Sequence, residues 1–424
     1  MRPFLADTVS VVLFFLIFSK GMVIKMNIKK QLQSFYAFEA LLSFRITDAV
    51  WVLFLIGRGY NLAQVGIAEG VFHITSMICE VPSGMLADLL GRKRTLIFAA
   101  IAGVVSSLFM GFGDHIIFIF VGMLFSGIAI SMASGTEEAI VYDSLLEAEQ
   151  EEQYRKIRVR ISIISRVCST MSCLFTPVAI FLGYQKLYLL SAAICILQII
   201  CLLCMKEPVT TKQQKRRQQK AYVQLRERWR LHVRTTGIFI KNHPQTMCKL
   251  LASAAIASPC YLTLMYLQEH LVACGWPESW IGIPILVIPL GGVVGAWLAS
   301  KRQISLWKTT LICGIAGGVG TIFAGNGILL VAIVGAMVAR ICEGNFEIHV
   351  SEETNREFPS DQRATLISVD GMLYSLVMIV LSPITGFIGD YYNIQLLFGF
   401  LGGSLVLATI VGLFIYRKKQ CRIQ

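Results

Sequence analysis

TLIFAAIAGVVSSLFMGFG, residues Thr95–Gly113, contains no Asp, Glu, Lys or Arg. An α-helix rises about 1.5 Å per residue, so about 20 apolar residues cross the roughly 30 Å hydrocarbon core of a bilayer. Five further uncharged runs lie at Leu187–Met205, Ser279–Ser300, Thr309–Ala339, Gly371–Gly389 and Tyr391–Tyr416. The stretch and its repetition along the chain predict a protein that crosses a membrane many times.

The composition supports membrane-spanning helices. Of 424 residues, 55% are hydrophobic and only 15% are charged, whereas soluble domains carry about 25% charged residues; the mean hydropathy is +0.66. The apolar runs are continuous, which favours helices over the alternating strands of a membrane barrel. We predict an all-α fold of about twelve transmembrane helices at 35–57, 62–86, 95–113, 116–140, 161–182, 187–205, 247–268, 279–300, 306–324, 328–350, 364–389 and 394–416.

Basic residues between these helices predict the orientation, because Lys and Arg favour cytoplasmic loops. With a cytoplasmic N-terminus, the inside segments hold Arg92–Arg94, the basic cluster at 155–160 and a long basic loop, and the outside loops hold only Arg58 and Lys186. Both termini are therefore predicted to be cytoplasmic in a multi-pass protein of the bacterial cytoplasmic membrane. The net charge of +12 follows from this asymmetry and does not indicate nucleic-acid binding.

The long basic loop divides the chain into two halves. We predict a six-helix bundle at 26–205, a basic cytoplasmic linker at 206–246, a second six-helix bundle at 247–416 and a tail at 417–424. The linker is an orientation signal, or alternatively an amphipathic helix on the membrane surface. Residues 1–25 are an extension whose apolar part is too short to span; we favour a true start near Met22 or Met26, with an interfacial segment or an extra span as alternatives.

Small residues recur at every fourth position in several predicted helices. Because burial of apolar surface cannot drive helix association in lipid, small residues that permit close backbone approach mark packing seams. The predicted seams are Gly103, Ser107 and Gly111; Gly291, Gly295 and Ala299; and Gly399 and Gly403. They predict a tightly packed bundle and do not indicate a substrate.

One loop carries a specific motif, Glu80-Val-Pro82-Ser-Gly84-Met-Leu-Ala-Asp88-Leu-Leu-Gly91-Arg92-Lys93-Arg94. It resembles the signature loop G-x-L-a-D-r-x-G-R-k of the major facilitator superfamily, and it lies after the second of twelve predicted helices. The resemblance covers roughly residues 35–416 and implies two pseudo-symmetric six-helix bundles around one central cavity.

The resemblance also implies a gate at the cytoplasmic side. Asp88 and Arg92 are expected to hold the two halves together there when the transporter is open outward, with Glu80 as a further gate element. Gly84 is expected to permit close approach of another helix and Gly91 to permit a tight turn. In the family the motif's Arg pairs with an acid at the inner end of the fourth helix, and Glu138 and Asp143 both lie in that stretch.

The fuller form, E-x-P-x5-D-x3-R-K, is similar to that of Gram-positive drug exporters, including a tetracycline-exporter group. In two helices this chain differs from the proton-driven drug exporters. Met123 occupies the position where the fourth helix usually carries an Arg, and the fifth helix keeps Pro177 but lacks the glycines of the antiporter motif. The resemblance therefore favours export, and these departures weaken the standard assignment of proton antiport.

Several ionisable residues fall inside predicted helices: Glu39, Arg45, Asp48, Glu69, His73, Arg340, Glu343, Glu347 and Asp370. Each costs about 2.5–3.5 kcal/mol at the centre of a lipid-exposed helix, so we expect them to face a central cleft or one another. Arg45 and Asp48 are three residues apart and are expected to share a helix face. Arg340, Glu343 and Glu347 likewise form one stripe.

The predicted function is secondary transport. A carboxylate or imidazole in a partly dry cavity can change its pKa, so Asp48, His73 and Glu343 are candidate proton carriers, with Arg45 and Arg340 tuning them or binding an anionic group. The alternative is structural ion pairing. We predict a proton-coupled exporter of a small amphipathic compound, with a nutrient importer or a transport-dead sensor or scaffold as alternatives. No enzyme motif, cofactor site or nucleotide-binding motif occurs, so the proton gradient is the expected driving force, and we expect a functional monomer.

Overall fold

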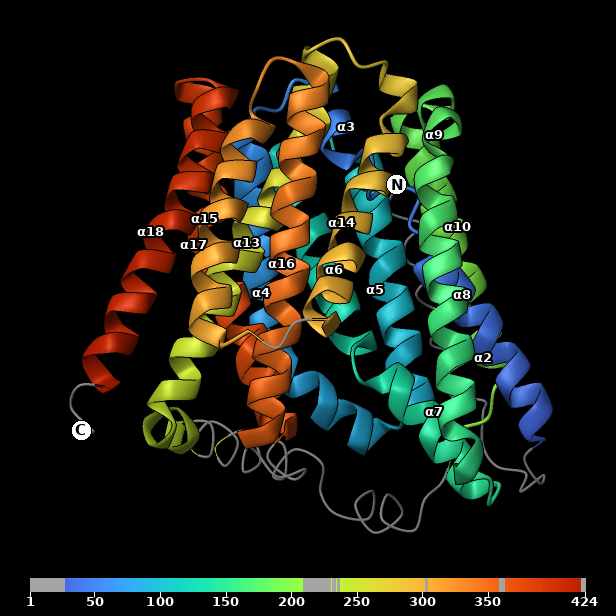
Figure 1. The fold of residues 1–424 in the computed structure, drawn as a ribbon. Coiled ribbons are helices and arrows are strands. Elements are labelled where there is room, and N and C mark those ends of the chain that lie inside the picture. Colours follow the sequence, from blue (N-terminus) through green and yellow to red (C-terminus); the bar gives the residue numbers. More distant parts are fainter. Residues whose placement is uncertain are drawn as a thin grey trace.

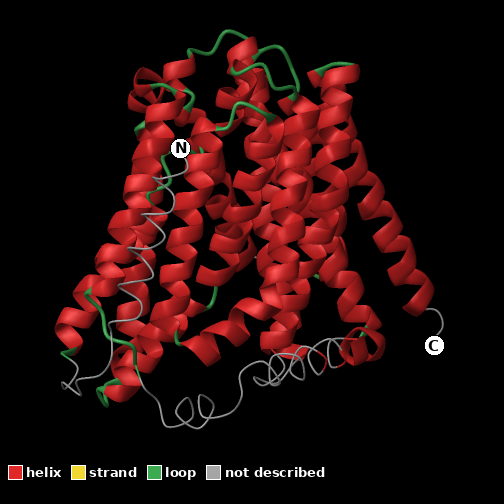
Figure 2. Ribbon diagram, turned by 180° about the vertical axis from the view of Figure 1, so that it is seen from behind, coloured by secondary structure: helices red, strands yellow, loops and turns green. Residues whose placement is uncertain are grey.

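The computed structural model describes residues 27–208, 230, 234, 237–301, 304–357 and 363–420. These residues fold into helices joined by short loops, and no strand occurs among them (Figure 2). The extension at 1–25, most of the linker at 206–246 and the last four residues of the tail lie outside the described part of the chain.

The first half of the described chain contains the elements α2 Ile28–Ser43, α3 Trp51–Gly57, α4 Leu62–Leu90, α5 Arg92–Phe112, α6 Ile116–Ala133, α7 Thr136–Glu147, η1 Glu151–Gln153, α8 Tyr154–Leu174, α9 Thr176–Leu182 and α10 Tyr184–Leu203. The second half contains α13 Pro244–Ala273, η2 Glu278–Trp280, α14 Gly282–Lys301, α15 Leu306–Ala324, α16 Leu329–Glu357, α17 Arg363–Tyr391 and α18 Ile394–Gln420.

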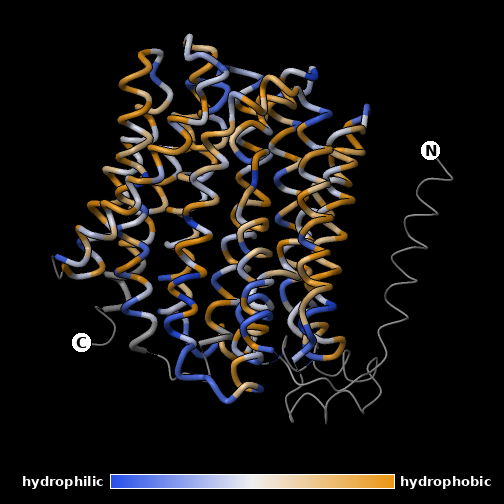
Figure 3. The backbone as a smooth tube through the Cα atoms, turned by 90° about the vertical axis from the view of Figure 1, so that its right-hand side faces the viewer, coloured by the Kyte–Doolittle hydropathy of each residue, from blue (hydrophilic) through white to orange (hydrophobic). Residues whose placement is uncertain are grey.

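The described helices are consistent with the predicted number of membrane spans. Ten are long and apolar enough to cross a membrane, and the bent pair α8–α9 makes up to eleven. The broken pair α2–α3 occupies the position of the first of the twelve predicted helices. Figure 3 shows hydrophobic residues along the length of the bundle, with hydrophilic residues gathered toward its lower end.

The helices form two groups that correspond to the two halves of the sequence (Figure 1). Within the first group α5 packs against α6 and α10, and within the second α16 packs against α14 and α15. The main contact between the groups is the pair α4–α17. We call the end of the bundle where α10 ends and α13 begins the inner end, and the opposite end, where α3 and α9 lie, the outer end.

The first predicted helix, 35–57, is not continuous. It ends at Ser43, and a turn at 44–50 separates α2 from α3. This turn contains Arg45, Thr47 and Asp48, whose charged and β-branched side chains give little support to a membrane helix. Irregular backbone is tolerated at membrane depth where it lines a cavity, and the turn lies at such a place.

The fifth predicted helix, 161–182, is also broken. It begins earlier, at Tyr154, and bends by 51° between α8 and α9. Pro177 lies in the first turn of α9, where its missing N–H is tolerated, whereas a straight helix through this position would lose a hydrogen bond.

Two of the three predicted packing seams lie at close helix contacts. A Cβ on Gly103 would lie 2.9 Å from the Cys195 sulfur, and one on Gly291 would lie 2.8 Å from the carbonyl oxygen of Met337. The prediction for the last helix is wrong, because a Cβ on Gly399 or Gly403 would meet nothing within 4 Å. The close contact of α18 is made by Gly402, one residue from the predicted register.

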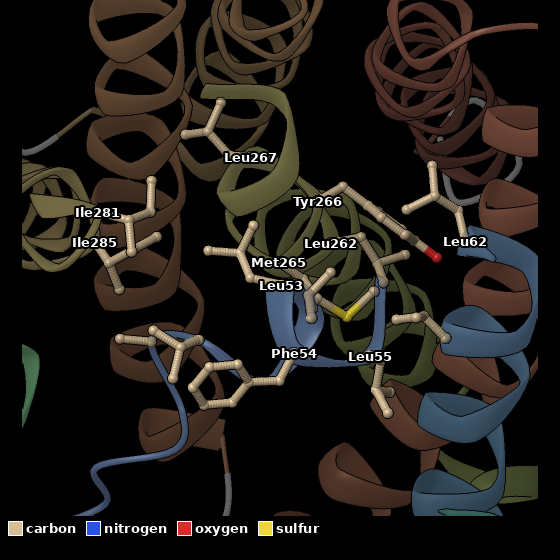
Figure 4. Close-up of a cluster of buried hydrophobic side chains, with 14 of the residues drawn as sticks. Leu53, Phe54, Leu55, Leu62, Leu262, Met265, Tyr266, Leu267, Ile281 and Ile285 are labelled. Atoms are coloured by element: carbon tan, nitrogen blue, oxygen red, sulfur yellow. The ribbon is translucent and has the colours of Figure 1, made fainter. Parts of the chain in front are cut away.

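A cluster of buried apolar side chains joins the two halves at the outer end (Figure 4). Leu53 and Leu55 of α3 and Leu62 of α4 come from the first half, and α13 contributes residues including Leu262 and Tyr266 from the second. Tyr266, Leu55 and Leu262 are completely buried. This cluster, which we call the outer gate, closes the bundle at that end.

Candidate functional site

A cavity of about 700 Å³ lies between the halves. Its wall comes mainly from α2, the turn at 44–50, α5, α6 and α10 of the first half, and α13 and α14 contribute from the second. It extends toward the inner end as far as Ser134 and Glu137. Three predicted site residues line it, namely Arg45, Asp48 and Glu69, and Met123, which replaces the Arg of proton-driven exporters, lines it as well.

The turn at 44–50 presents Arg45 and Asp48 to this larger cavity. Both side chains are exposed there, and no ion pair within 4 Å joins them among the described residues. The expectation that they share a helix face is therefore not met, because the helix is interrupted between α2 and α3. The turn is instead held across the halves, since the Gln268 side-chain amide of α13 donates to the Asp48 carbonyl oxygen at 3.2 Å.

Glu69 and His73 form a buried pair on α4. The His73 Nε2 and Glu69 Oε1 atoms are 3.3 Å apart, and both side chains are at least nine-tenths buried. Glu69 lines the larger cavity, whereas the His73 ring packs edge-on against the Tyr374 ring of α17, at 5.5 Å between centroids. The pair therefore connects the cavity to the second half of the molecule.

A smaller cavity of about 320 Å³ lies in the second half. The remaining predicted site residues line it together: Arg340, Glu343, Glu347 and Asp370. Arg340 Nη1 donates to Glu343 Oε2 one turn along α16. Tyr261 of α13 lines both cavities. These seven residues thus fall into two adjacent groups, one per half, and not into a single site, whereas Glu39 and His73 line neither cavity.

The signature loop, residues 80–94, folds as the end of α4, a one-residue turn and the start of α5. Gly91 has φ +107°, a conformation that favours glycine, and the expected tight turn is formed there. Arg92 Nη2 lies 2.9 Å from Asp88 Oδ1, and Arg92 Nε lies 3.4 Å from Asp143 Oδ2. The alternative acid, Glu138, pairs with Arg158 of α8. Asp143 is therefore the partner of Arg92.

Other motif residues remain inside the helix. Glu80 is partly buried, and its carbonyl oxygen accepts from the Ser83 hydroxyl at 2.9 Å, next to Pro82. A Cβ on Gly84 would meet nothing within 4 Å. No helix of the described residues therefore approaches Gly84 closely in this conformation.

The partner that fixes this loop was not among the predicted site residues. The Glu207 carboxylate accepts from the backbone N–H groups of Arg92 at 2.6 Å and of Lys93 at 3.0 Å. Lys93 Nζ in turn donates to the carbonyl oxygens of Leu203 and Met205 at 3.1 and 2.6 Å. The start of the linker therefore caps the N-terminus of α5, where a carboxylate is favoured by the helix dipole.

A family model of the Major Facilitator Superfamily matches residues 33–348, about three quarters of the chain. The chain belongs to the major facilitator superfamily. The family match makes it a multi-pass membrane protein of a transporter superfamily rather than an enzyme.

Two curated transporters are similar to parts of this superfamily member. The MFS-type transporter YxaM of Bacillus subtilis (strain 168) is 32% identical over 106 residues, covering 24% of this chain. A transporter of Buchnera aphidicola subsp. Schizaphis graminum (strain Sg) is 25% identical over 144 residues, covering 34% of it. The matched stretches span 27% and 35% of the two relatives' own lengths.

Solved structures with the same fold are more distant in sequence. A mutant of the nucleoside transporter NupG matches with a TM-score of 0.74 and 15% identity over 92% of this chain and 100% of its own. A mutant of the peptide transporter POT in complex with sulfate matches with a TM-score of 0.67 and 13% identity, over 94% and 96% of the two chains. At this identity the likeness establishes the fold.

In this superfamily member the outer gate is reinforced by polar contacts between α4 and α17. Asp390, near the end of α17, accepts from the N–H groups of Leu62 and Ala63 in the first turn of α4, at 2.8 and 2.7 Å. The Ser382 hydroxyl donates to the Gly66 carbonyl oxygen at 2.6 Å. At the inner end, the ion pairs Arg92–Asp143, Arg158–Glu138 and Lys249–Glu353 each lie within one half.

None of Asp390, Ser382 and Gln268 was predicted to be a site residue. Asp390 was visible in the sequence as the single charge between the uncharged runs 371–389 and 391–416. The two neutral side chains gave no such signal, because Ser and Gln are also common at helix packing contacts in membranes.

Proposed function

We propose that this transporter is a proton-coupled exporter of a small amphipathic compound. The observation that carries the proposal is the larger cavity, which combines a mostly apolar wall with the carboxylates of Asp48 and Glu69 between the two halves. A site of this composition accepts a molecule with an apolar body and a polar or charged group. The E-x-P form of the signature loop supports export over import.

The orientation is part of the same proposal. The inner end is the cytoplasmic side of a bacterial cytoplasmic membrane, with both termini cytoplasmic and the monomer as the working unit. The contrast between the outer loops and the basic inner segments supports this orientation. The structure then corresponds to an inward-facing state, because its outer end is closed and its larger cavity extends toward the inner end.

Alternating access follows from this arrangement. A proton taken up from outside and released inside would favour one of two packings of the halves. We propose Asp48 and Glu343 as proton carriers, because each lines a cavity and they lie in opposite halves. His73 is buried against Glu69 and lines neither cavity, so its proposed role is to stabilise the charge of Glu69.

Transport in inside-out vesicles with an imposed pH gradient tests the proposal. Substrate accumulation that requires an acidic lumen, from a panel of amphipathic compounds, is the expected result. Asp48→Asn and Glu343→Gln should each lower coupled flux at least tenfold while the protein still inserts. Glu278→Gln, which removes the same charge from an exposed position in η2, should leave flux unchanged.

The outcome also separates the alternatives. Movement of substrate out of the vesicle lumen together with protons would identify an importer. Normal coupled flux in both Asp48→Asn and Glu343→Gln would refute the proton-carrier assignment. Substrate binding without flux in the parent protein would identify a sensor.

A further inference from the structure

The charge of the two cavities is opposite to that of the whole chain. The chain carries 38 Lys and Arg against 26 Asp and Glu. By contrast, each cavity wall contains three carboxylates and one arginine, namely Asp48, Glu69, Glu137 and Arg45 in the larger and Glu343, Glu347, Asp370 and Arg340 in the smaller. Walls of one predominant sign concentrate ligands of the other sign in a low-dielectric cleft.

Most of these carboxylates are not neutralised by the arginines. Arg340 pairs with Glu343. Arg45 donates weakly to the Leu42 carbonyl oxygen at 3.5 Å and forms no ion pair within 4 Å with Asp48 in the described part of the chain. Asp48 therefore faces the larger cavity without a bound cation of the protein's own.

A second observation points to a hydrogen-bond donor as the missing partner. Gln268 is 3% exposed and lines the larger cavity, and its Oε1 atom has no hydrogen-bond partner among the described residues. Only the Nε2 group can donate to the Asp48 carbonyl oxygen, so this bond fixes the amide with its oxygen unpaired. Glu69 Oε1, at ion-pair distance from His73, also lacks hydrogen-bond geometry to any described donor.

An unpaired buried acceptor is costly, and the cost is removed when a ligand supplies the donor. The Gln268 Oε1 atom is such an acceptor, and it lies in one cavity wall with the carboxylates of Asp48 and Glu69. A positively charged N–H group satisfies both requirements at once, because it donates hydrogen bonds and neutralises charge.

Aromatic rings and size restrict the ligand further. Trp51, Phe72 and Tyr261 line the same cavity as Asp48 and Glu69. Aromatic faces attract cations, most strongly where water is excluded. A volume of about 700 Å³ lies in the range of pockets that enclose drug-sized molecules and far exceeds the needs of a metal ion.

We propose that the larger cavity binds organic cations, with the positive centre between Asp48, Glu69 and the Gln268 carbonyl oxygen and the apolar body against the aromatic wall. This inference rests on the proposed function, because it names the class of substrate that the proposed exporter would carry. Anionic and neutral molecules of the same shape bind weakly, because they leave the acceptors and carboxylates uncompensated.

Equilibrium binding of two ions of matched shape and opposite charge tests the proposal. The purified full-length chain in lipid nanodiscs is titrated with tetraphenylphosphonium and, separately, with tetraphenylborate. We expect saturable binding of the cation at least tenfold tighter than binding of the anion. Asp48→Asn and Glu69→Gln should each weaken cation binding roughly tenfold, whereas Glu278→Gln should not change it.

Several outcomes would overturn the proposal. These are equal or tighter binding of tetraphenylborate, no saturable binding of tetraphenylphosphonium, or cation affinity within twofold of the parent in both cavity variants. The comparison of the two ions uses the parent protein, so it tests the proposal even if a variant fails to fold. Because binding needs no proton gradient, retained binding without vesicle flux would refute only the proposed transport, and flux without cation binding would refute only this inference.

Discussion

The outer and inner ends of the α4–α17 pair contain similar residues but pack differently. At the outer end Gly66 and Gly386 each lie so close to the backbone of the opposite helix that a Cβ would clash, with the carbonyl oxygens of Ser382 and Leu62 respectively. At the inner end a Cβ added to Gly84 or Gly371 would meet no described atom within 4 Å. One helix pair therefore carries small residues at both ends and uses only the outer ones in this conformation.

This difference indicates which helix contacts must change when the larger cavity opens toward the outer end. Packed interfaces are bistable and do not deform continuously, so closure of the inner end is expected to require a second close approach, made by the unused glycines.

Gly66→Val should have the largest effect. Added atoms at a tightly packed contact cost about 1–3 kcal/mol, and about 1.4 kcal/mol is a tenfold change in a two-state population. We expect transport to fall at least tenfold and the outer end to open. The distance between spin labels at positions 60 and 391, on a cysteine-free background, measures the opening. Gly412→Val is the matched control, since a Cβ there meets nothing within 4 Å; an unchanged distance in Gly66→Val would contradict the prediction.

Gly84→Val should reduce transport several-fold without destabilising the present conformation. The added side chain meets open space here but would obstruct the inner contact of the alternate state. Thermal unfolding should therefore stay within about 2 °C of the parent protein. Parent-like transport would show that Gly84 takes no part in inner closure.

Asp390→Asn should have a smaller effect on the outer gate. The amide keeps an acceptor for the Leu62 N–H but loses the negative charge at the N-terminus of α4, which is worth about 0.3–1 kcal/mol. We expect a two- to fivefold shift toward the outward-open state in the same spin-label measurement. Asp114→Asn, at an outer-loop acid that is 94% exposed, is the control; equal shifts in both variants would exclude a specific role for Asp390.

Glu207→Gln should have the smallest effect. It weakens the cap on α5 but leaves the α4–α17 pair intact. Loss of a charged cap costs about 1 kcal/mol, so in a chain of this length the melting temperature should fall by about 1 °C with little change in transport. A loss of transport comparable to that of Gly66→Val would mean that the linker couples directly to the gate.

The sequence predicted the fold well because membrane spans are specified by length and polarity. The uncharged runs located most helices, and the signature loop identified the superfamily. The break at 44–50 was not predicted, since Ala49, Val50 and Trp51 continue the apolar pattern and the contact of the turn with the Gln268 amide is not visible in the sequence. The length of an apolar run does not show where a helix is interrupted beside a cavity.

The candidate site was predicted as a list of residues but not as an arrangement. Spacing along a helix correctly grouped Arg340 with Glu343 but wrongly grouped Arg45 with Asp48, because the second pair does not lie on a helix. The choice between Glu138 and Asp143 depended on where α7 and α8 meet, which no local pattern encodes. Glu207 belongs to a charged linker, where one functional acid is not distinguishable from its neighbours.

Tyr261 separates the two cavities as a shared wall residue. A tyrosine ring reorients by rotation about two side-chain bonds, on a timescale far shorter than a transport cycle. Rotation of this ring changes the wall that the Asp48 and Glu343 compartments share. We therefore expect the length of molecule that fits the Asp48 compartment to depend on the orientation of this single side chain.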